Sequence, residues 1–198
     1  MHAPSRIYLA SPTGKPMCLR QGEILTNVVR IKLDLVTLGT SKLDVVTFVH
    51  PYAMIVTQDC DLEQDFNVRF REPKVSDKLL PSILFCELAT AVELRGTTGI
   101  TSDIWRRISQ NKDERYHFLQ AVEAGSDAEQ NGLPELGIDF KRVFTLPTDE
   151  LYLRIELGEA KRRSVLQSPY LEHLSERLAH FNSRVALPED HFSEPGGK

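Results

Sequence analysis

Apolar and polar residues alternate over much of the first third of the chain, which is the pattern of strands with one buried face. Residues 21–35 are rich in valine, isoleucine and leucine, and over 29–35 the apolar side chains fall at every second position. A break at 39–41 is followed by a strand-like stretch at 43–49, and Pro51 opens a third that stays apolar to Val56. We expect strands at these three places. The shared apolar face of the first comprises Val29, Ile31, Leu33 and Leu35, opposite Arg30, Lys32 and Asp34.

The rest of the chain predicts further strands and one long excursion. Residues 62–81 mix charges with prolines, so we expect a loop there with at most one short strand near 66–70. Residues 151–157 alternate like a strand, although their good helix formers leave a helix from Asp149 open. The other predicted strands are residues 7–9, 82–94, 115–119, 138–146 and 162–167.

Two helices are predicted. Residues 103–108 have the apolar spacing of a short amphipathic helix, capped by Thr101 or Ser102. The second follows Ser168, a suitable N-cap, with Pro169 at the first helical position. Its apolar stripe would lie on the sheet as a lid and consists of Leu171, Leu174, Leu178 and Phe181.

These elements predict an α+β fold that is mainly β: a small, curved sheet or barrel with a helical insertion and a C-terminal closing helix. We expect an irregular arm at 1–20 and a single barrel-like domain at 21–187. Its polar insertion would occupy 96–132, and a flexible tail would follow at 188–198.

Composition restricts the classes of function. The 198 residues include 24 basic and 28 acidic side chains, so the net charge is -4 and a nucleic-acid site would have to be a local patch. No apolar run approaches the roughly 20 residues that cross a bilayer, and the N-terminus lacks the apolar core of a signal peptide. Cys18, Cys60 and Cys86 are widely spaced, which favours the reducing cytoplasm over a disulfide framework.

The segment from Tyr52 to Leu62 concentrates the most chemistry, because an apolar strand ends there in Gln58-Asp59-Cys60-Asp61. Cys60 would be a nucleophile if His50 or His117 served as its base. Alternatively, Asp59 and Asp61 would bind a hard cation such as Mg²⁺ together with a third oxygen ligand. The structural alternative makes Cys60 a small buried side chain and the carboxylates caps of the following turn.

A second candidate is a basic cluster with interleaved aromatic side chains. Such side chains could stack on bases while the cations neutralise phosphates. Acidic residues are mixed into the same stretch, so a solvated amphipathic surface is the alternative. The cluster comprises Trp105, Arg106, Arg107, Lys112, Arg115, Tyr116 and His117.

Three segments resemble the MazF/PemK family, bacterial endoribonucleases of toxin–antitoxin modules with an SH3-like barrel. Gln21-Gly22-Glu23-Ile24 is similar to the family's opening strand, and Asp139-Phe140-Lys141-Arg142-Val143 to its strand before the final helix. His50-Pro51-Tyr52-Ala53-Met54-Ile55-Val56 is similar to its Arg-Pro strand, with His50 in place of the arginine. The Thr-Gln-Asp-Cys-Asp-Leu motif is also similar to one in uncharacterised bacterial and phage-encoded proteins.

The resemblance implies a toxin–antitoxin or phage-defence setting. Our first hypothesis is a cytoplasmic binding or regulatory domain without a cofactor, acting on a protein partner or RNA, with a homodimer left open. The second is a MazF-like endoribonuclease, in which His50, Arg115 or His117 would supply acid–base and phosphate-stabilising groups. The third is a hydrolase that uses Cys60.

Overall fold

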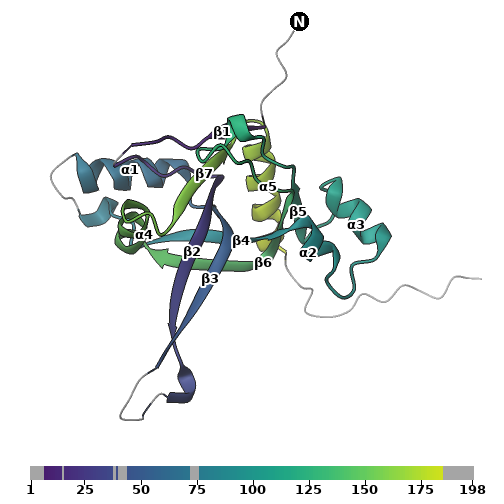
Figure 1. Cartoon of the computed structure of the whole chain (residues 1–198), viewed down its shortest axis with the longest axis horizontal. Coiled ribbons are helices and arrows are strands. Elements are labelled where there is room, and N and C mark those ends of the chain that lie inside the picture. Colours follow the sequence, from purple (N-terminus) through teal and green to yellow (C-terminus); the bar gives the residue numbers. More distant parts are fainter. Residues whose placement is uncertain (1–6, 15, 38, 40–43, 72–75, 185–198) are drawn as a thin grey trace, which may run out of the picture.

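The computed structural model shows one antiparallel sheet with helices on both faces (Figure 1). It describes residues 7–14, 16–37, 39, 44–71 and 76–184, so the predicted tail lies outside the described residues. The strand order is β1-β7-β2-β3-β4-β6-β5. The strands are β1 (Tyr8–Ala10), β2 (Glu23–Leu33), β3 (Val45–Ile55), β4 (Ser82–Thr90), β5 (Tyr116–Leu119), β6 (Leu136–Pro147) and β7 (Lys161–Leu166). The helices are α1 (Asp59–Phe70), α2 (Ala91–Arg95), α3 (Ser102–Ser109), α4 (Thr148–Glu156) and α5 (Tyr170–Asn182).

The mixed α/β class is confirmed, whereas the closed barrel is not. β1 and β5 form the two edges of the sheet, and the described residues show no strand pairing between them. Both are short, with 3 and 4 residues. The edges are still connected, because the Tyr8 hydroxyl donates a 3.1 Å hydrogen bond to the carbonyl of Gln120, just after β5. The sheet therefore curls toward closure and remains open.

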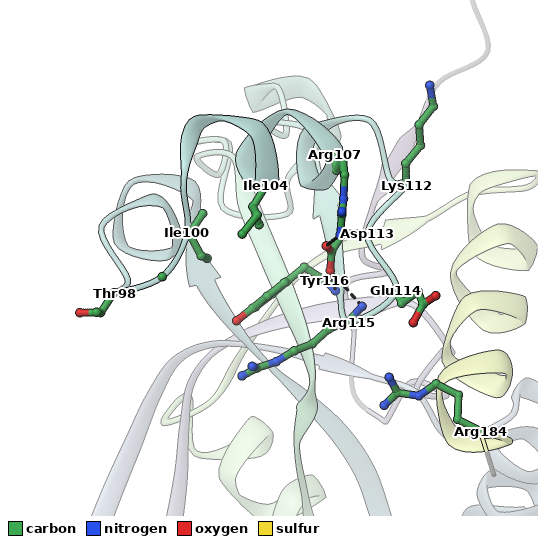
Figure 2. Close-up of a pocket in the computed structure, with 11 residues that line it drawn as sticks. Thr98, Ile100, Ile104, Arg107, Lys112, Asp113, Glu114, Arg115, Tyr116 and Arg184 are labelled. Carbon is green, nitrogen blue, oxygen red and sulfur yellow. Dashed lines mark hydrogen bonds and ion pairs between the residues drawn. The ribbon is translucent and has the colours of Figure 1, made fainter. Parts of the chain in front are cut away.

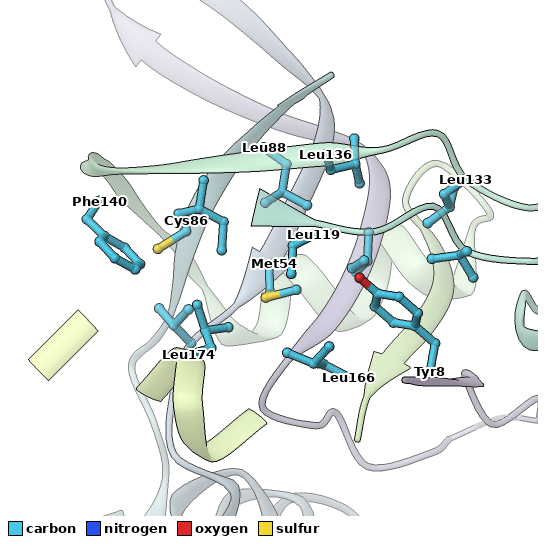
Figure 3. Close-up of a cluster of buried hydrophobic side chains, with 14 of the residues drawn as sticks. Tyr8, Met54, Cys86, Leu88, Leu119, Leu133, Leu136, Phe140, Leu166 and Leu174 are labelled. Carbon is cyan, nitrogen blue, oxygen red and sulfur yellow. The ribbon is translucent and has the colours of Figure 1, made fainter. Parts of the chain in front are cut away.

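Helix α5 covers one face of the sheet, as the apolar stripe predicts. Leu174 is buried there in one cluster with Met54, Cys86 and Phe140 (Figure 3). Phe181 belongs to the same cluster and packs against Phe140. Burying one such side chain contributes about 1.5–3 kcal/mol. Ser168 does not cap this helix, since the N-cap position is Pro169 and no side-chain cap bond forms.

Helices α1 and α4 cover the opposite face. Leu62 of α1 and Leu151 of α4 are fully or almost fully buried there, beside Ala53, Ile55 and Phe85. The period-two pattern of β3 explains both layers, because Ala53 and Ile55 point to this face while Met54 points to the α5 face. The buried strand expected after Pro51 is thus the centre of the sheet.

The prediction of a loop over 62–81 was wrong for residues 62–70, because helix α1 fills residues 59–70. Leu62, Phe66 and Phe70 recur every four residues, and the first two are buried. Asp65 and Arg69, also four apart, form a bidentate ion pair at 2.7 and 3.0 Å. The charges suggested a solvated loop, whereas Asp65 is buried in its pair with Arg69, and Asp61 and Glu63 lie on the exposed side of the helix.

Two further strand predictions were wrong. Residues 151–157 fall largely within helix α4, where Leu151 is buried with Ile155 packed beside it, while Leu153 and Leu157 are exposed. The strand expected to continue to residue 94 ends at Thr90, which forms a capping box with Glu93 and starts α2. No helix in the described part of the chain is long and apolar enough to span a bilayer.

The predicted insertion at 96–132 is largely integrated into the fold. Helix α3 forms where expected, with the Thr101 side chain accepting a hydrogen bond from the Ile104 amide. Its Ile108 is fully buried beside Leu94 and Tyr116. Strand β5, also predicted, pairs with β6 and so forms one edge of the sheet.

A two-stranded arm projects from the sheet (Figure 1). β7 pairs with β2 only over residues 23–26, and β4 pairs with β3 only over 52–55. Beyond these limits β2 and β3 pair only with each other. The stretches 43–49 and 51–56, predicted as separate strands, are one strand, because Pro51 sits where the ladder is interrupted opposite Asn27, whose φ is 59°. We define the arm as residues 28–37 and 44–50.

Candidate functional site

The Gln58–Asp61 segment begins helix α1 directly after the central strand. Asp59 accepts hydrogen bonds from Nε and Nη2 of Arg20 at 3.1 and 2.9 Å and from the Gln21 amide at 2.7 Å. Partial burial raises the pKa of Asp59, but these hydrogen bonds outweigh it and hold the pKa below its usual value. Asp59 therefore fastens the chain before β2 to the start of α1.

Cys60 is exposed, so the interpretation that made it a buried side chain was wrong. Its Sγ lies 3.7 Å from Oδ1 of Asp61, which is also exposed, and Gln58 makes no side-chain cap bond. Among the described residues no three His, Cys, Asp or Glu side chains gather as metal ligands, so Asp59 and Asp61 lack further carboxylate or imidazole ligands. The contacts of this segment give Asp59 the role of an anchor between distant segments, which was not among the roles expected for it.

The two candidate histidines lie on opposite faces of the sheet. His50 stacks on Phe144, on the face that α1 and α4 cover, with ring centroids 4.0 Å apart. Burial lowers the pKa of His50, although Nδ1 lies 4.0 Å from a Glu87 oxygen. His117 lies on the α5 face, and burial, aided by the Arg177 charge, lowers its pKa to about 3. Within the part of the chain that the structure describes, neither imidazole ring is seen in contact with Cys60.

Arg115, the fourth predicted catalytic residue, pairs with Asp139 through Nε at 2.8 Å and through Nη2. Its guanidinium also lies over the Tyr116 ring, 4.8 Å from the centroid. Arg115 therefore contacts neither histidine nor Cys60 in the described structure. The structure does not bring the four predicted catalytic residues together.

A cleft of about 690 Å³ opens between the loop before α3 and the start of β5 (Figure 2). Its cations include Arg107, Lys112, Arg115 and Arg184, so it contains part of the predicted basic cluster. Arg107 pairs with Asp113 at 2.8 Å, and Glu114 lines the same wall. We call this space the β5 cleft. Two of these four cations, Arg107 and Arg115, are paired with carboxylates.

The remaining members of the basic cluster do not form one surface. Arg106 pairs with Asp103, one turn back on α3. Trp105 packs edge-on against Phe118, with ring centroids 6.0 Å apart, and is only partly exposed. His117 is buried. This arrangement agrees with the expected alternative of a solvated amphipathic surface.

The arm presents the largest run of exposed apolar side chains in the described structure. Leu35 is 76% and Val36 88% exposed at its tip, and Ile31 is 52% exposed in its middle. Cross-strand partners share a face, so one face of the arm is uncharged throughout. This apolar arm face comprises Val29, Ile31, Leu33, Val45, Thr47 and Val49.

The opposite face carries charges. Arg30 and Lys32 both lie over the Phe48 ring, at 5.6 and 5.4 Å, and no described carboxylate pairs with either cation. Toward the tip, the Asp34 amide donates a 2.9 Å hydrogen bond to the Asp44 carbonyl. By the alternation of the strand, Asp34 follows Arg30 and Lys32 on this side, which we call the charged arm face.

The sequence predicted the alternating strand of the arm, but the prediction that its apolar face is buried was wrong. The pattern was taken as a core-facing strand, yet Ile31 and Leu33 extend beyond the strands that could cover them. The available signal was length, since two strand-like stretches flanking residues 39–41 exceed the mean strand of about 5–6 residues. No protein-family model and no curated protein matches the chain.

Proposed function

We propose that the chain is a binding domain that engages a protein partner through the arm, in the toxin–antitoxin or phage-defence setting that the family resemblance implies. The observation that carries this proposal is the uninterrupted apolar arm face, which continues into the exposed Leu35 and Val36. Contiguous apolar surface of this kind marks protein interaction sites. Covering it removes apolar area from water at about 25 cal/mol per Å².

The backbone of the arm supports the same proposal. Between residues 28 and 33 strand β2 pairs only with β3, so both outer edges of the arm leave backbone groups open. A two-stranded hairpin is marginally stable in water by itself. Natural proteins usually protect such edges with charges, prolines or covering elements. An arm with open edges and an apolar face is best explained by a partner that covers it.

The charged arm face suggests that the partner carries carboxylates. Arg30 and Lys32 have no carboxylate partner among the described residues, and Arg30 Nε is buried without a hydrogen-bond partner. Nine other arginines of the described chain pair with a carboxylate, at Arg20, Arg69, Arg106, Arg107, Arg115, Arg142, Arg154, Arg162 and Arg163. A carboxylate supplied by a partner would satisfy the arm cations.

Site-specific photo-crosslinking tests this function. A photoreactive phenylalanine analogue replaces Leu35 at the arm tip or, as the matched control, Val92, which is 82% exposed on α2. Irradiation of cells producing each variant should yield discrete protein adducts from position 35 only. Adding Ile31→Glu should remove them. Adducts to RNA alone, or equal adducts from both positions, would contradict a protein-binding arm.

The β5 cleft supports a second candidate function, the binding of single-stranded RNA. Lys112 and Arg184 line it without a described carboxylate partner, and Tyr116 contributes to its wall. We would measure fluorescence polarisation with a labelled RNA at two salt concentrations for the parent chain and for Lys112→Gln with Arg184→Gln. A phosphate-binding cleft requires affinity that falls as salt rises and falls again in the variant. Equal signals for both proteins would dismiss this candidate.

A further inference from the structure

We infer that the partner contributes an extended segment of alternating acidic and apolar residues, which pairs as an added strand with the outer edge of β2 in the arm. The inference rests on the proposed function, because it names the chemistry and the binding mode of the partner of the arm. A segment that adds to a sheet edge gains affinity from backbone hydrogen bonds and specificity from its alternate side chains.

Strand β2 offers an open backbone edge along the arm (Figure 1). β7 occupies this edge only over residues 23–26 of β2. Over 28–33 the described backbone of β2 forms hydrogen bonds with β3 alone. Ile31, Lys32 and Leu33 are exposed there. A strand added here would continue the sheet on the side where β7 stops, and the open stretch suits a segment of ordinary strand length, about 5–6 residues.

The two faces of β2 define the side chains that such a strand needs. Directly opposite residues of paired strands share a face. On the charged arm face, Arg30 and Lys32 favour acidic residues opposite them. On the apolar arm face, Val29, Ile31 and Leu33 favour apolar residues. Because the faces alternate along the strand, the matching segment alternates acidic and apolar residues.

The positions of the cations favour the edge of β2 over the edge of β3. On the charged arm face, the side chains that β3 contributes are those of Val46 and Phe48. A strand added to β3 would have these uncharged neighbours, and Arg30 and Lys32 would lie two strand spacings away, about 10 Å. On β2, the Cβ atom of an acidic residue would lie about 4.5–5.5 Å from the Cβ atom of each cation.

The positive charge on this face is unmatched in the described part of the chain. Arg30 and Lys32 lie over the Phe48 ring, and neither has a described ion pair. Burial lowers the pKa of the neighbouring His50, and the charges of Arg30 and Lys32 lower it further. Both cations therefore act on the same small region at the base of the arm, where carboxylates of a partner would be stabilised.

The same cations disfavour a second copy of this chain as the added strand. Two β2 edges that pair antiparallel about Ile31 would match their apolar faces, but they would set Arg30 of each copy opposite Lys32 of the other. Like charges directly opposite each other destabilise a strand pair. A segment with carboxylates at these positions converts that repulsion into attraction.

Peptide binding to the full chain, measured by fluorescence polarisation, tests the inference. The probe is a labelled peptide of about eight residues that alternates valine and glutamate, with matched peptides that carry glutamine or lysine instead of glutamate. The parent should bind the glutamate peptide roughly tenfold more tightly than the glutamine peptide, and the lysine peptide least.

Charge reversal on the arm should reverse this order. Arg30→Glu with Lys32→Glu should bind the lysine peptide more tightly than the glutamate peptide. The control is Lys78→Glu with Lys141→Glu, which changes the net charge equally at two exposed lysines outside the arm and should keep the order of the parent. Circular dichroism of both variants should match the parent.

Backbone methylation tests whether the peptide binds as a strand. Along a strand, the N–H groups of alternate residues point to the same edge. Methylating the backbone nitrogens of all glutamates, or instead those of all valines, therefore blocks opposite edges of the same peptide. One methylated peptide should bind like the unmodified one, and the other should lose at least about tenfold in affinity. Equal affinities of the two would overturn an added strand.

Other outcomes would also overturn the inference. They are equal binding of all peptides, binding of none, or a dimer of the parent that the glutamate peptide fails to dissociate. An RNA oligonucleotide that binds as tightly as the glutamate peptide and is lost in the charge-reversed variant would show that the cations serve a polyanion instead.

These outcomes can be told apart from failure of the proposed function. If the peptide tests fail while Leu35 still crosslinks to a protein in cells, the arm remains a protein-binding surface and only the mode of binding changes. If position 35 gives no protein adduct at all, the proposed function fails as well.

Discussion

Arg177 of α5 donates a 3.0 Å hydrogen bond from Nη1 to Nδ1 of His117 on β5. An arginine can only donate, so Nδ1 accepts and the neutral imidazole keeps its proton on Nε2. The other guanidinium nitrogen, Nη2, donates to the carbonyl of Tyr116 at 2.9 Å and to that of Asp113. Arg177 thus fastens the closing helix to the edge strand, and it keeps His117 uncharged.

Replacing Arg177 should loosen this edge of the sheet. Arg177→Met removes the hydrogen bonds to the imidazole and to the two carbonyls, and leaves part-buried acceptors unmet. We expect the free energy of unfolding to fall by about 2–4 kcal/mol, since one hydrogen bond to a charged group contributes about 1.5–3 kcal/mol. Urea unfolding measures the change. The control is Arg106→Met, which removes an exposed ion pair with Asp103 and should change stability by less than about 1 kcal/mol.

His117 should make stability depend on pH above the carboxylate range. Burial, then the charge of Arg177 and then His173, lowers its folded pKa to about 3, below its usual 6.5. Between these values the unfolded chain binds a proton that the folded chain does not. Stability contributed by neutral His117 is therefore complete above pH 6.5 and is lost as pH falls toward 3, with a limiting slope of about 1.4 kcal/mol per unit.

The measurement is the free energy of unfolding at several pH values from 7 to 4.5. His117→Gln retains an acceptor for Arg177 and removes the titration, so its slope should be smaller than that of the parent. His50, whose pKa is also lowered by burial, contributes in the same direction and stays in both proteins. Equal slopes for the parent and the variant would show that His117 is not held neutral by the fold.

Helix α4 makes a prediction that a strand at 151–157 does not share. In the helix Leu151 is fully buried and Leu153 is 54% exposed, whereas in a strand the two would share one face. Leu151→Ala should cost about 2–5 kcal/mol of stability, and Leu153→Ala less than about 1 kcal/mol. Thermal or urea unfolding of the two variants distinguishes the helix from the strand. Similar losses for both variants would support the strand.

Substitutions of Asp59 and Asp61 should likewise differ in their effect on stability. Asp59→Asn removes the charge that accepts from Arg20 and Gln21, so the melting temperature should fall, by an amount that corresponds to about 1–2 kcal/mol. Asp61→Asn alters an exposed side chain and should leave the melting temperature unchanged. The pKa of Asp59 is held low, so the stabilisation by Asp59 should be present near neutral pH and disappear as pH falls through its folded pKa. Matching effects of the two variants would argue against an anchor at Asp59.

The pattern along the chain predicted the elements whose period is unambiguous. Strand β6 and helix α5 follow from alternation and from a leucine stripe, and Thr101 was identifiable as the cap of α3. Helices α1 and α4 were missed for different reasons. In α1 the charged residues between Leu62 and Phe66 hid their spacing. In α4 leucines two residues apart imitated a strand, although of these only Leu151 is buried.

The candidate site was the harder prediction, because ion pairing depends on contacts between distant segments. Nothing near Arg115 in sequence identifies Asp139 as its partner, and nothing near Asp59 identifies Arg20. In the sequence these residues resembled a reactive or basic surface, whereas their ion pairs connect distant segments and stabilise the fold. The arm was not predicted for a related reason. Alternating apolar and polar residues indicate a strand with one apolar face, but not which other segment packs on that face.

Amide hydrogen exchange on the arm tests most directly whether protein covers it. The account predicts that exchange in residues 28–37 and 44–50 is slower when the chain is isolated together with the proteins that crosslink at position 35 than when it is purified alone, while exchange in α3 is the same in both. Ile31→Glu should hold the arm at the fast rate throughout. Arm amides that exchange equally fast in both preparations would contradict a protein partner on the arm.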